Sequence, residues 1–477
     1  MSSLFATLGT SAQSLSVYER ALETVQNNVS NASTPGYATQ TVDFSALSFD
    51  PQSGLAGGVS AGTSSSRDQY ADESVRRQLS NLGTAQQSSA SLGAIESSFD
   101  VTGQQGIPAA LSRFFNSFSA LSVAPNSPGA RSSAIVAAQA VVSSFRQTAS
   151  DLAGASSSAE KGIQSQIGQI NALARQIQSY NVQRAQSGHA DFGLDANQAA
   201  ALEKLSSLAG ISVTTAPDGS ASVLLNGQIP LVLGSQSFAL QAGFEVAGPP
   251  APANPGGIPG IRISDVNGRD VTSHLTQGSL SGLLQFRNTT LAGLRGSYTQ
   301  QGSLNSLAAA FANRVNTLLQ SGTVTDAAGA TRGVALFTYD SANPTRTAES
   351  LSLTGIDGSQ LATAQPGPPP ISNGIALSLT NLAQGLSAAD QVNGLTYTGY
   401  FAQVAAGIGQ GLSDAKAAAD FHGQASTQAQ ALRARLSGVS LDAEAVRLIE
   451  YQKAYNATAK LISVLDQITQ STLDIVK

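Results

Sequence analysis

The chain has 477 residues, enough for about three domains of ~150 residues each. Its 30 acidic and 25 basic residues give a net charge of −5, so there is no basic excess to neutralise nucleic-acid phosphates. Cysteine is absent, which excludes disulfides and thiolate sites, and three scattered histidines argue against a histidine-rich metal centre. With 12% charged and 5% aromatic residues, the composition favours long helices packed through small and aliphatic side chains.

Membrane and export signals are not evident in the sequence. No run approaches the ~18–20 consecutive apolar residues of a spanning helix, so we expect no membrane insertion. The first five residues, Met1 to Phe5, place no basic region ahead of an apolar block, as a secretory signal peptide would. We therefore expect a protein that stays in the cytosol or leaves by a route without a cleavable signal.

Apolar residues recur along the first thirty positions at alternating spacings of four and three. The stripe consists of Leu4, Leu8, Ser11, Leu15, Tyr18, Leu22, Val25 and Val29. This heptad pattern predicts a helix of about 45 Å, at 1.5 Å per residue.

A helix stop follows the stripe, in a run that extends from Asn27 to Tyr37. Pro35 ends the helix, and Thr34-Pro35-Gly36-Tyr37 fits a type II turn with Pro second and Gly third. The side chains of Asn28 and Asn31 can bond the freed backbone groups of the helix end. We interpret Asn28, Asn31, Pro35, Gly36 and Tyr37 as a structural stop rather than a ligand site.

The middle of the chain changes period twice. Helical spacing predicts helices over 70–100, 107–122, 130–152, 158–186, 196–209 and 279–320. A period of two predicts short strands over 211–214, 222–225, 261–264, 336–337 and 351–353. Residues 245–260 and 365–370 are rich in proline and are expected to be linkers or loops.

From about residue 397 the sequence predicts helix to the end of the chain. One apolar row consists of Ala454, Thr458, Leu461, Leu465, Ile468, Thr472 and Ile475, and a flanking row of Leu448, Tyr451, Tyr455, Ile462, Leu473 and Val476. Ser440 is a candidate N-cap, with Asp442 and Glu444 in the first turn. Each terminal stripe could pack on its own domain, or the two ends could pair with each other and with other subunits.

Two segments resemble a known family. The run from Leu15 to Asp43, centred on Asn27 to Tyr37, resembles the N-terminal signature of bacterial flagellar rod, hook and hook-associated proteins. The run from Ser437 to Glu444, continued by Leu448 to Ala457, resembles their C-terminal signature. Ser437-Gly438-Val439 and the segment from Gly278 to Arg287 look most like the subunit at the hook–filament junction, whereas the helical middle differs from the largely β hook protein.

The resemblance implies a mainly α fold with a smaller β part, in which paired N- and C-terminal helices form a coiled-coil core. We expect 1–50 with 400–477 to form this core, 51–210 with 279–320 a helical rod, 211–278 a β-hairpin part and 321–399 a small outer region. The expected assembly interface comprises Leu4, Leu8, Leu15, Leu22, Val25, Val29, Leu448, Tyr455, Leu461, Ile462, Leu465, Ile468 and Ile475. In it, the first stripe should meet Leu461, Leu465, Ile468 and Ile475.

The implied function is structural: a homo-oligomeric, extracellular subunit of the flagellum that joins hook to filament, without cofactors or metals. Implied partners are further copies, the hook protein, the adjacent hook-associated junction protein, an export chaperone and the type III export apparatus. A distal rod or hook subunit is the close alternative. A flagellum-associated cell-wall hydrolase and a secreted translocator that inserts in host membranes are alternatives from other classes.

Catalytic motifs are weak. Gly58-Val59-Ser60-Ala61-Gly62 matches a nucleophile elbow but is expected in a Gly/Ser loop, without the strand–turn–helix context. The run from Asp265 to Asp270 begins like a calcium loop, lacks the downstream Glu and fits a hairpin turn. Gly407 to Gly411 follows no strand, and His189 near Asp191 is expected to be a solvated pair. Carboxylate pairs that meet only in space stay open.

Overall fold

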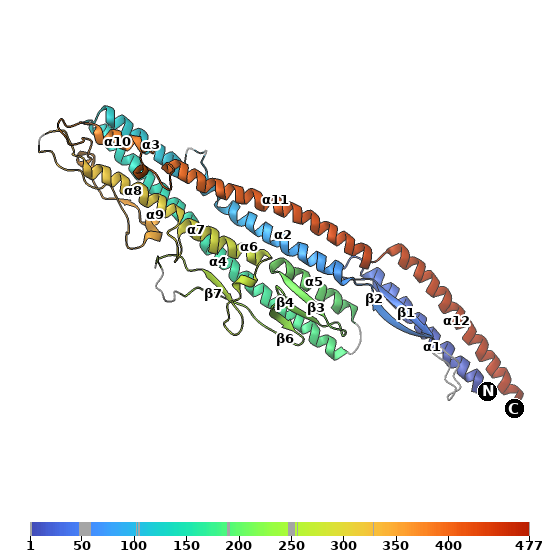
Figure 1. The fold of residues 1–477 in the computed structure, drawn as a ribbon. Coiled ribbons are helices and arrows are strands. Elements are labelled where there is room, and N and C mark those ends of the chain that lie inside the picture. Colours follow the sequence, from blue (N-terminus) through green and yellow to red (C-terminus); the bar gives the residue numbers. More distant parts are fainter. Residues whose placement is uncertain are drawn as a thin grey trace. The chain divides into compact units, whose positions relative to one another are not determined.

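A computed structural model describes residues 2–46, 59–101, 103, 105–187, 191–246, 253–254, 256–327 and 329–476. The described chain is mainly helical, with small antiparallel sheets, which confirms the expected fold class (Figure 1). It divides into two compact units. Unit 1 contains 1–80, 171–238 and 422–477, and unit 2 contains 81–170 and 239–421. The four-part division expected from the sequence stays a prediction.

Unit 1 contains both chain ends. Its elements are α1 (Ser2–Ser30), β1 (Gln40–Ala46), β2 (Val59–Ser65), the start of α2 (Gln69–Glu96), the end of α4 (Pro128–Ser187), α5 (Phe192–Leu208), β3 (Ile211–Thr215), β4 (Ala221–Leu225), β5 (Ile229–Leu233), β6 (Gln236–Ser237), the end of α11 (Tyr397–Ser437) and α12 (Leu441–Val476). Helices α1 and α12 pack against each other, as the sequence predicts. A heptad stripe becomes a stable helix only when its apolar face is covered, so each terminal helix supports the other.

The hairpin of β1 and β2 is an addition that the sequence did not predict. Its strands pair in antiparallel register from Gln40 opposite Ser65 to Ala46 opposite Val59, and both strands contact α1. Residues 59–62, expected in a Gly/Ser loop, therefore form part of a strand, while Gly58 lies outside the described residues. The error has a physical reason: β2 lacks the alternating apolar residues by which a strand is usually recognised.

A second small sheet in unit 1 has the strand order β3-β4-β5-β6. Its β4 alternates buried and half-buried residues, with Val223 and Leu225 fully buried. Asn181, near the end of α4, donates from Nδ2 to the carbonyl oxygens of Ala221 and Gly234, at 2.9 and 2.7 Å. This buried amide fixes the sheet to the helix.

Unit 2 is built mainly from helices and short strands. Its elements are the rest of α2, α3 (Gly106–Val123), most of α4, β7 (Gln241–Phe244), β8 (Ile261–Ser264), α6 (Ser279–Gln285), a π-helical turn (Phe286–Thr290), α7 (Leu291–Arg295), α8 (Ser303–Ser321), β9 (Phe337–Thr338), α9 (Thr347–Ser350), β10 (Ser352–Leu353), α10 (Gly374–Asn381) and the start of α11. Five 3₁₀ turns complete the described chain: Ser97–Phe99, Thr272–His274, Pro344–Arg346, Gly358–Gln360 and Ala388–Asp390.

An aromatic cluster forms the core of unit 2, although the chain is poor in aromatics. Phe114 and Phe118 of α3 have ring centroids 4.7 Å apart. Phe311 of α8 contacts Phe114 at 5.1 Å and both Phe337 and Tyr397 at 5.5 Å. All five side chains are at most 1% exposed. Burial of each phenylalanine contributes roughly 1.5–3 kcal/mol, so a few large side chains concentrated at one place are enough for a core.

The segment from Gly278 to Arg287 forms a tightly packed wedge in unit 2. A Cβ on Gly282 would lie 2.8 Å from the carbonyl oxygen of Thr84 in α2. On the other side, Leu283 lies against Gly162 of α4. A Cβ on Gly162 would be 2.8 Å from the Cδ2 of Leu283. The buried Arg287 donates from Nε and Nη2 to Oε1 of Glu160, at 2.9 and 2.6 Å. Small residues and one buried ion pair therefore fix α6 between two long helices.

Two helix boundaries differ from the sequence prediction. Residues 130–152 and 158–186 belong to one continuous helix, α4, because the Gly and Ser residues between the two apolar runs do not interrupt it. The expected helix over 279–320 is broken at 296–302, where Gly296 and Gly302 have φ of 93° and 88°. The proline-rich residues 247–252 and 255 lie outside the described part of the chain.

Candidate assembly site

The turn after α1 has the predicted geometry. Gly36 has φ of 76°, the left-handed value that the third position of a type II turn requires, and the Tyr37 amide donates to the Thr34 carbonyl at 3.1 Å. A side chain at Gly36 would also collide with α5, because its Cβ would lie 2.7 Å from the Ala196 carbonyl oxygen. Both the turn and its contact therefore require glycine.

Asn28 connects this turn to the first strand. The side chain is fully buried. Its Nδ2 donates to the Gln40 carbonyl at 2.9 Å, and its Oδ1 accepts from the Gln40 amide and the Tyr37 hydroxyl, each at 3.0 Å. The Asn28 carboxamide thus pairs with both the amide and the carbonyl of Gln40. A neighbouring strand would make the same two bonds, so Asn28 takes its place at the start of β1.

The two sequence signatures meet directly beyond this point. The Thr39 amide donates to the Ser437 carbonyl at 2.8 Å, and the Thr39 hydroxyl donates to the Gly438 carbonyl at 2.7 Å. The Ser437 hydroxyl in turn accepts from the Asp68 amide at 3.0 Å. Three segments that are distant in sequence are thereby joined at one α-turn between α11 and α12.

Glycine and serine define that turn. A Cβ on Gly438 would lie 2.3 Å from the Ala434 carbonyl oxygen, so no other residue fits without a shift. Ser440 precedes α12, and its Oγ accepts weakly from the Ala443 amide at 3.4 Å, as expected of an N-cap.

Glu444 is 1% exposed, and its Oε1 accepts from Arg447 at 2.7 Å. Burial first, and then the nearby Glu444, raise the pKa of Tyr37.

An aromatic contact joins the hairpin to both terminal helices. The Phe44 ring in β1 lies 6.0 Å from that of Tyr18 in α1 and 5.9 Å from that of Tyr451 in α12. Burial is the largest cause that raises the pKa of Tyr451. Further along the helices, the Tyr455 hydroxyl donates to Glu19 at 3.2 Å. The hairpin is therefore a third component of the terminal pair.

The buried face of α1 is rotated slightly from the predicted stripe. Ser11, Val17, Ala21, Thr24, Val25 and Asn28 are buried, and Leu8, Leu15, Tyr18 and Leu22 are half-buried. Val29 is 46% exposed in the single chain, so its place in the assembly interface stays a prediction. Because successive helix residues are about 100° apart, the inward position of Asn28 turns Val29 outward. The side chain of Leu4 lies outside the description.

The same rotation holds for α12. The half-buried residues that follow Glu444 include Leu448, Tyr451, Tyr455, Thr458, Ile462, Leu465, Thr469 and Thr472, again at spacings of four and three, with Arg447, Ala454 and Ala459 beside them. Leu461 and Ile468 were expected in the seam, but they are 51% and 47% exposed and lie about 100° around the helix. The side chain of Ile475 is not described. The half-buried face of α12 therefore takes Leu448, Tyr451, Tyr455 and Ile462 from the flanking row, and Thr458, Leu465 and Thr472 from the first row.

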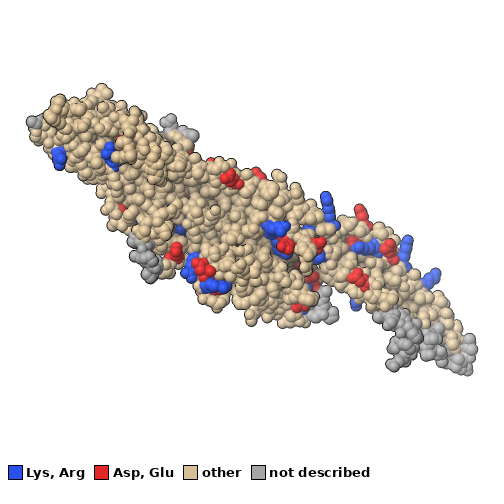
Figure 2. All heavy atoms as spheres, viewed as in Figure 1, with Lys and Arg blue, Asp and Glu red and all other residues tan. Residues whose placement is uncertain are grey.

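Apolar residues consequently lie on the exposed side of α12. We define this outer face as Val446, Ile449, Leu461, Val464 and Ile468, all at least 45% exposed. Figure 2 shows that basic (blue) and acidic (red) side chains around α1 and α12 are dispersed among uncharged residues (tan). Exposed apolar residues in a row on a helix are typical of a surface that another chain covers.

The weak catalytic strings have structural roles or lie outside the description. The Asp265 carboxylate accepts from the amides of Asn267 and Arg269, each at 2.9 Å, and so closes the expected turn. Gly407 to Gly411 lie inside α11, and Asp191 caps α5, while His189 is outside the described residues. Among the residues described, no cluster of three or more His, Asp or Glu could hold a metal ion. None of the described helices is long and apolar enough to cross a bilayer.

Known proteins match these features. The family described as "Flagellar hook-associated protein FlgK helical domain" matches residues 92–337, and "Flagellar basal body rod FlgEFG protein C-terminal" matches 433–475. Flagellar hook-associated protein 1 of Bacillus subtilis is 27% identical over 506 residues, which cover 99% of each chain. The protein of that name in Salmonella typhimurium is 26% identical over 314 residues, which cover 63% of this chain and 54% of that one.

The fold also has a solved counterpart. The structure of the flagellar hook junction protein FlgK from Burkholderia pseudomallei aligns with a TM-score of 0.63 at 17% identity. The alignment covers 77% of this chain and all of that one. Because the helical-domain match extends over just over half of the residues, this chain belongs to the flagellar hook-associated protein FlgK family.

Proposed function

We propose that this chain is a structural subunit that joins the hook of the bacterial flagellum to its filament. The observation that carries this function is the pairing of α1 with α12, which leaves the outer face of α12 uncovered. Burial of apolar surface stabilises by about 25 cal/mol per Å², so contacts between copies can hold a tube without any chemistry. The names of the relatives, hook-associated and hook junction protein, support the same place in the flagellum.

In this proposal the assembled copies contact the hook protein on one side and the adjacent hook-associated junction protein on the other, outside the cell. The predicted interface residues act in two groups. Leu8, Leu15, Leu22, Val25, Leu448, Tyr455, Ile462 and Leu465 hold the two ends of one chain together, and Val29, Leu461 and Ile468 contact neighbouring copies; Leu4 and Ile475 continue the pattern.

We further propose that the chain passes through the type III export apparatus after a transient cytoplasmic stage, with a chaperone on its C-terminal helix. The absence of cysteine suits a chain that must cross unfolded and fold outside. A long helix with one apolar stripe is marginal in water on its own, so α12 needs a cover before α1 becomes available.

A strain that lacks this protein tests the junction role. Electron micrographs should show hooks without filaments, and filament subunits should accumulate in the medium. Expression of the intact chain from a plasmid should restore filaments. Normal filaments on the deletion strain would contradict the proposal.

A gold-labelled antibody against unit 2 separates the junction from the rod and hook alternatives. On isolated flagella the label should form one band between hook and filament. Label along the hook or on the rod would instead support a distal rod or hook subunit.

A further inference from the structure

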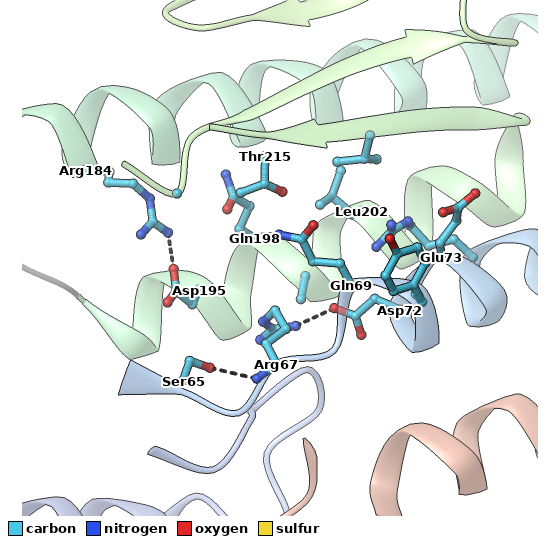
Figure 3. A pocket seen from close by; sticks show the side chains of 15 residues that line it. Ser65, Arg67, Gln69, Asp72, Glu73, Arg184, Asp195, Gln198, Leu202 and Thr215 are labelled. Carbon is cyan, nitrogen blue, oxygen red and sulfur yellow. Dashed lines mark hydrogen bonds and ion pairs between the residues drawn. The ribbon is translucent and has the colours of Figure 1, made fainter. Parts of the chain in front are cut away.

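Unit 1 contains a polar cavity that the assembly role does not use. It holds about 270 Å³ and is lined by the first turns of α2, by α5 and by β3. Figure 3 shows Gln69 of α2, Gln198 of α5 and Thr215 of β3 among its labelled side chains. Three arginines line the cavity as well, so its charge balance decides what it could bind.

Two of these arginines already have partners. Arg67 donates from Nη1 to Asp72 at 2.9 Å and from Nη2 to the Gly36 carbonyl at 2.5 Å. Arg184 forms an ion pair with Asp195. The lining acids Asp72 and Asp195 therefore each have a cationic partner.

Arg76 differs from both. In the described part of the chain, no hydrogen bond or ion pair reaches its guanidinium. Burial lowers the pKa of Arg76, against the opposing influence of Asp72, Glu73 and Glu203. Arg433 pairs with two of these acids, Asp72 at 3.5 Å and Glu203. The guanidinium stays charged and has five N–H donors, none of which is paired among the described residues, although these acids offset part of its desolvation.

Three other lining side chains have donors without hydrogen bonds among the described residues. They are the Gln69 amide, the Thr215 hydroxyl and the hydroxyl of Tyr70, whose side chain is 85% exposed. We propose that the cavity binds a small oxyanion, a carboxylate or phosphate group, on Arg76 with Gln69, Tyr70 and Thr215 as supporting donors. Charge-assisted hydrogen bonds to an oxyanion are what an otherwise unpaired guanidinium is suited to make.

Glu73 gives this site an internal test. It lines the cavity, is exposed and has no ion pair among the described residues, so its charge opposes an incoming anion. Arg76 lies one helical turn further along α2. Neutralising these two neighbours should therefore change anion affinity in opposite directions.

Isothermal titration of the full chain with inorganic phosphate, and separately with acetate, at low ionic strength tests the site. We expect saturable binding of at least one, and the tighter of the two identifies the group. Arg76→Gln should weaken binding by roughly tenfold or more, and Glu73→Gln should strengthen it severalfold. Arg77→Gln is the matched control, because this exposed neighbour does not line the cavity, and it should leave affinity unchanged.

Thermal melts of each variant show whether it is folded. If Arg76→Gln does not fold, Glu73→Gln and Thr215→Val decide, with tighter and weaker binding expected respectively. Absence of binding to the intact chain, equal affinity in folded Arg76→Gln, or weaker binding in Glu73→Gln would overturn the site. Because binding is measured on the isolated chain, the result is independent of the junction role.

Discussion

The hydroxyl of Thr39 donates a 2.7 Å hydrogen bond to the carbonyl oxygen of Gly438, which lies 399 residues further along the chain. Thr39 is part of the first sequence signature, and Gly438 is part of the second. The first signature contains the end of α1, and the second contains the turn that precedes α12, so their contact fixes these two helix ends to each other within unit 1. The family patterns at the two chain ends therefore specify one shared joint rather than two independent helix stops.

Gly438→Ala should weaken this joint. The added Cβ would lie 2.3 Å from the Ala434 carbonyl oxygen, so the backbone that Thr39 contacts must shift. We expect a loss of about 1–3 kcal/mol in the free energy of unfolding, and faster hydrogen exchange of the Thr39 amide. Gly9→Ala is the control: nothing lies within 4 Å of its Cβ, and it should stabilise α1 by roughly 0.5–1 kcal/mol. Unchanged exchange at Thr39 in Gly438→Ala would contradict the joint.

Asn28→Ala should destabilise unit 1 more than any other amide truncation in the helix stop. It leaves both backbone groups of Gln40 without partners in a buried place. Each such group costs about 1–3 kcal/mol, so we expect roughly 2–4 kcal/mol in chemical denaturation. Asn31→Ala removes two exposed hydrogen bonds, from Nδ2 to the Asn27 carbonyl and from the Thr34 hydroxyl to Oδ1, and should cost under about 1 kcal/mol. Equal losses in the two variants would show that Asn28 has no special role.

Local features of the chain were predictable because they depend on neighbours in sequence. The turn at Pro35 and Gly36, the cap at Ser440 and most helices follow from residues within one or two turns. The hairpin β1–β2 was not predictable, because β2 carries small and polar residues without alternation. Its strand character comes from pairing with β1 and contact with α1, which no local pattern records.

The site itself was predicted in part. The sequence identified two apolar rows on α12 and predicted that the first, with Leu461, Leu465 and Ile468, meets α1, whereas the half-buried residues come from both rows. The choice depends on partners that only the fold supplies, such as Phe44 beside Tyr18 and Tyr451, and Glu19 beside Tyr455. A rotation of about 100° separates Leu461 from Ile462, so an error of one residue exchanges the inner and outer faces.

This division of faces makes a prediction about assembly. Leu461→Asp combined with Ile468→Asp changes only the outer face, so the purified chain should melt at an unchanged temperature. It should nevertheless fail to restore filaments in a strain lacking the protein, because neighbouring copies would have to bury two carboxylates.

Leu465→Asp lies on the seam, so it should loosen α12 from α1 and block incorporation while unit 2 stays folded.

Lys460→Ala is the matched control for the outer face, since it removes an exposed charge beside Leu461 without adding a buried one. It should restore filaments normally. If the outer-face double variant restores filaments as well as the intact chain, the outer face does not contact other copies.

Arg131→Lys should destabilise unit 2 although the charge is kept. The buried Arg131 donates to four carbonyl oxygens, those of Pro125, Val324, Gly358 and Leu361, and to the Thr363 hydroxyl. A lysine ammonium has three N–H donors and lacks the planar geometry of a guanidinium, so it cannot bond all five of these acceptors. We expect a loss of roughly 2–4 kcal/mol in denaturant titration, against less than about 0.5 kcal/mol for the exposed control Arg146→Lys.

Tyr397 should make the stability of unit 2 depend on alkaline pH. Burial, and then the nearby Asp390, raise the pKa of its hydroxyl from 10.0 to about 12. The folded state thus holds the proton more tightly than the unfolded chain does. The contribution is complete below pH 10 and is lost as the pH rises from about 10 to 12, at up to about 1.4 kcal/mol per pH unit.

Tyr397→Phe separates this titration from all others. The hydroxyl is buried without a hydrogen-bond partner in the described part of the chain, so its removal should change stability at neutral pH by under about 0.5 kcal/mol. Between pH 10 and 12 the variant should lose less stability than the intact chain, as measured by denaturant midpoints at each pH. Equal losses in both proteins would contradict this prediction. They would mean that the Tyr397 hydroxyl ionises as readily in the folded protein as in the unfolded chain, because it reaches water before it loses its proton.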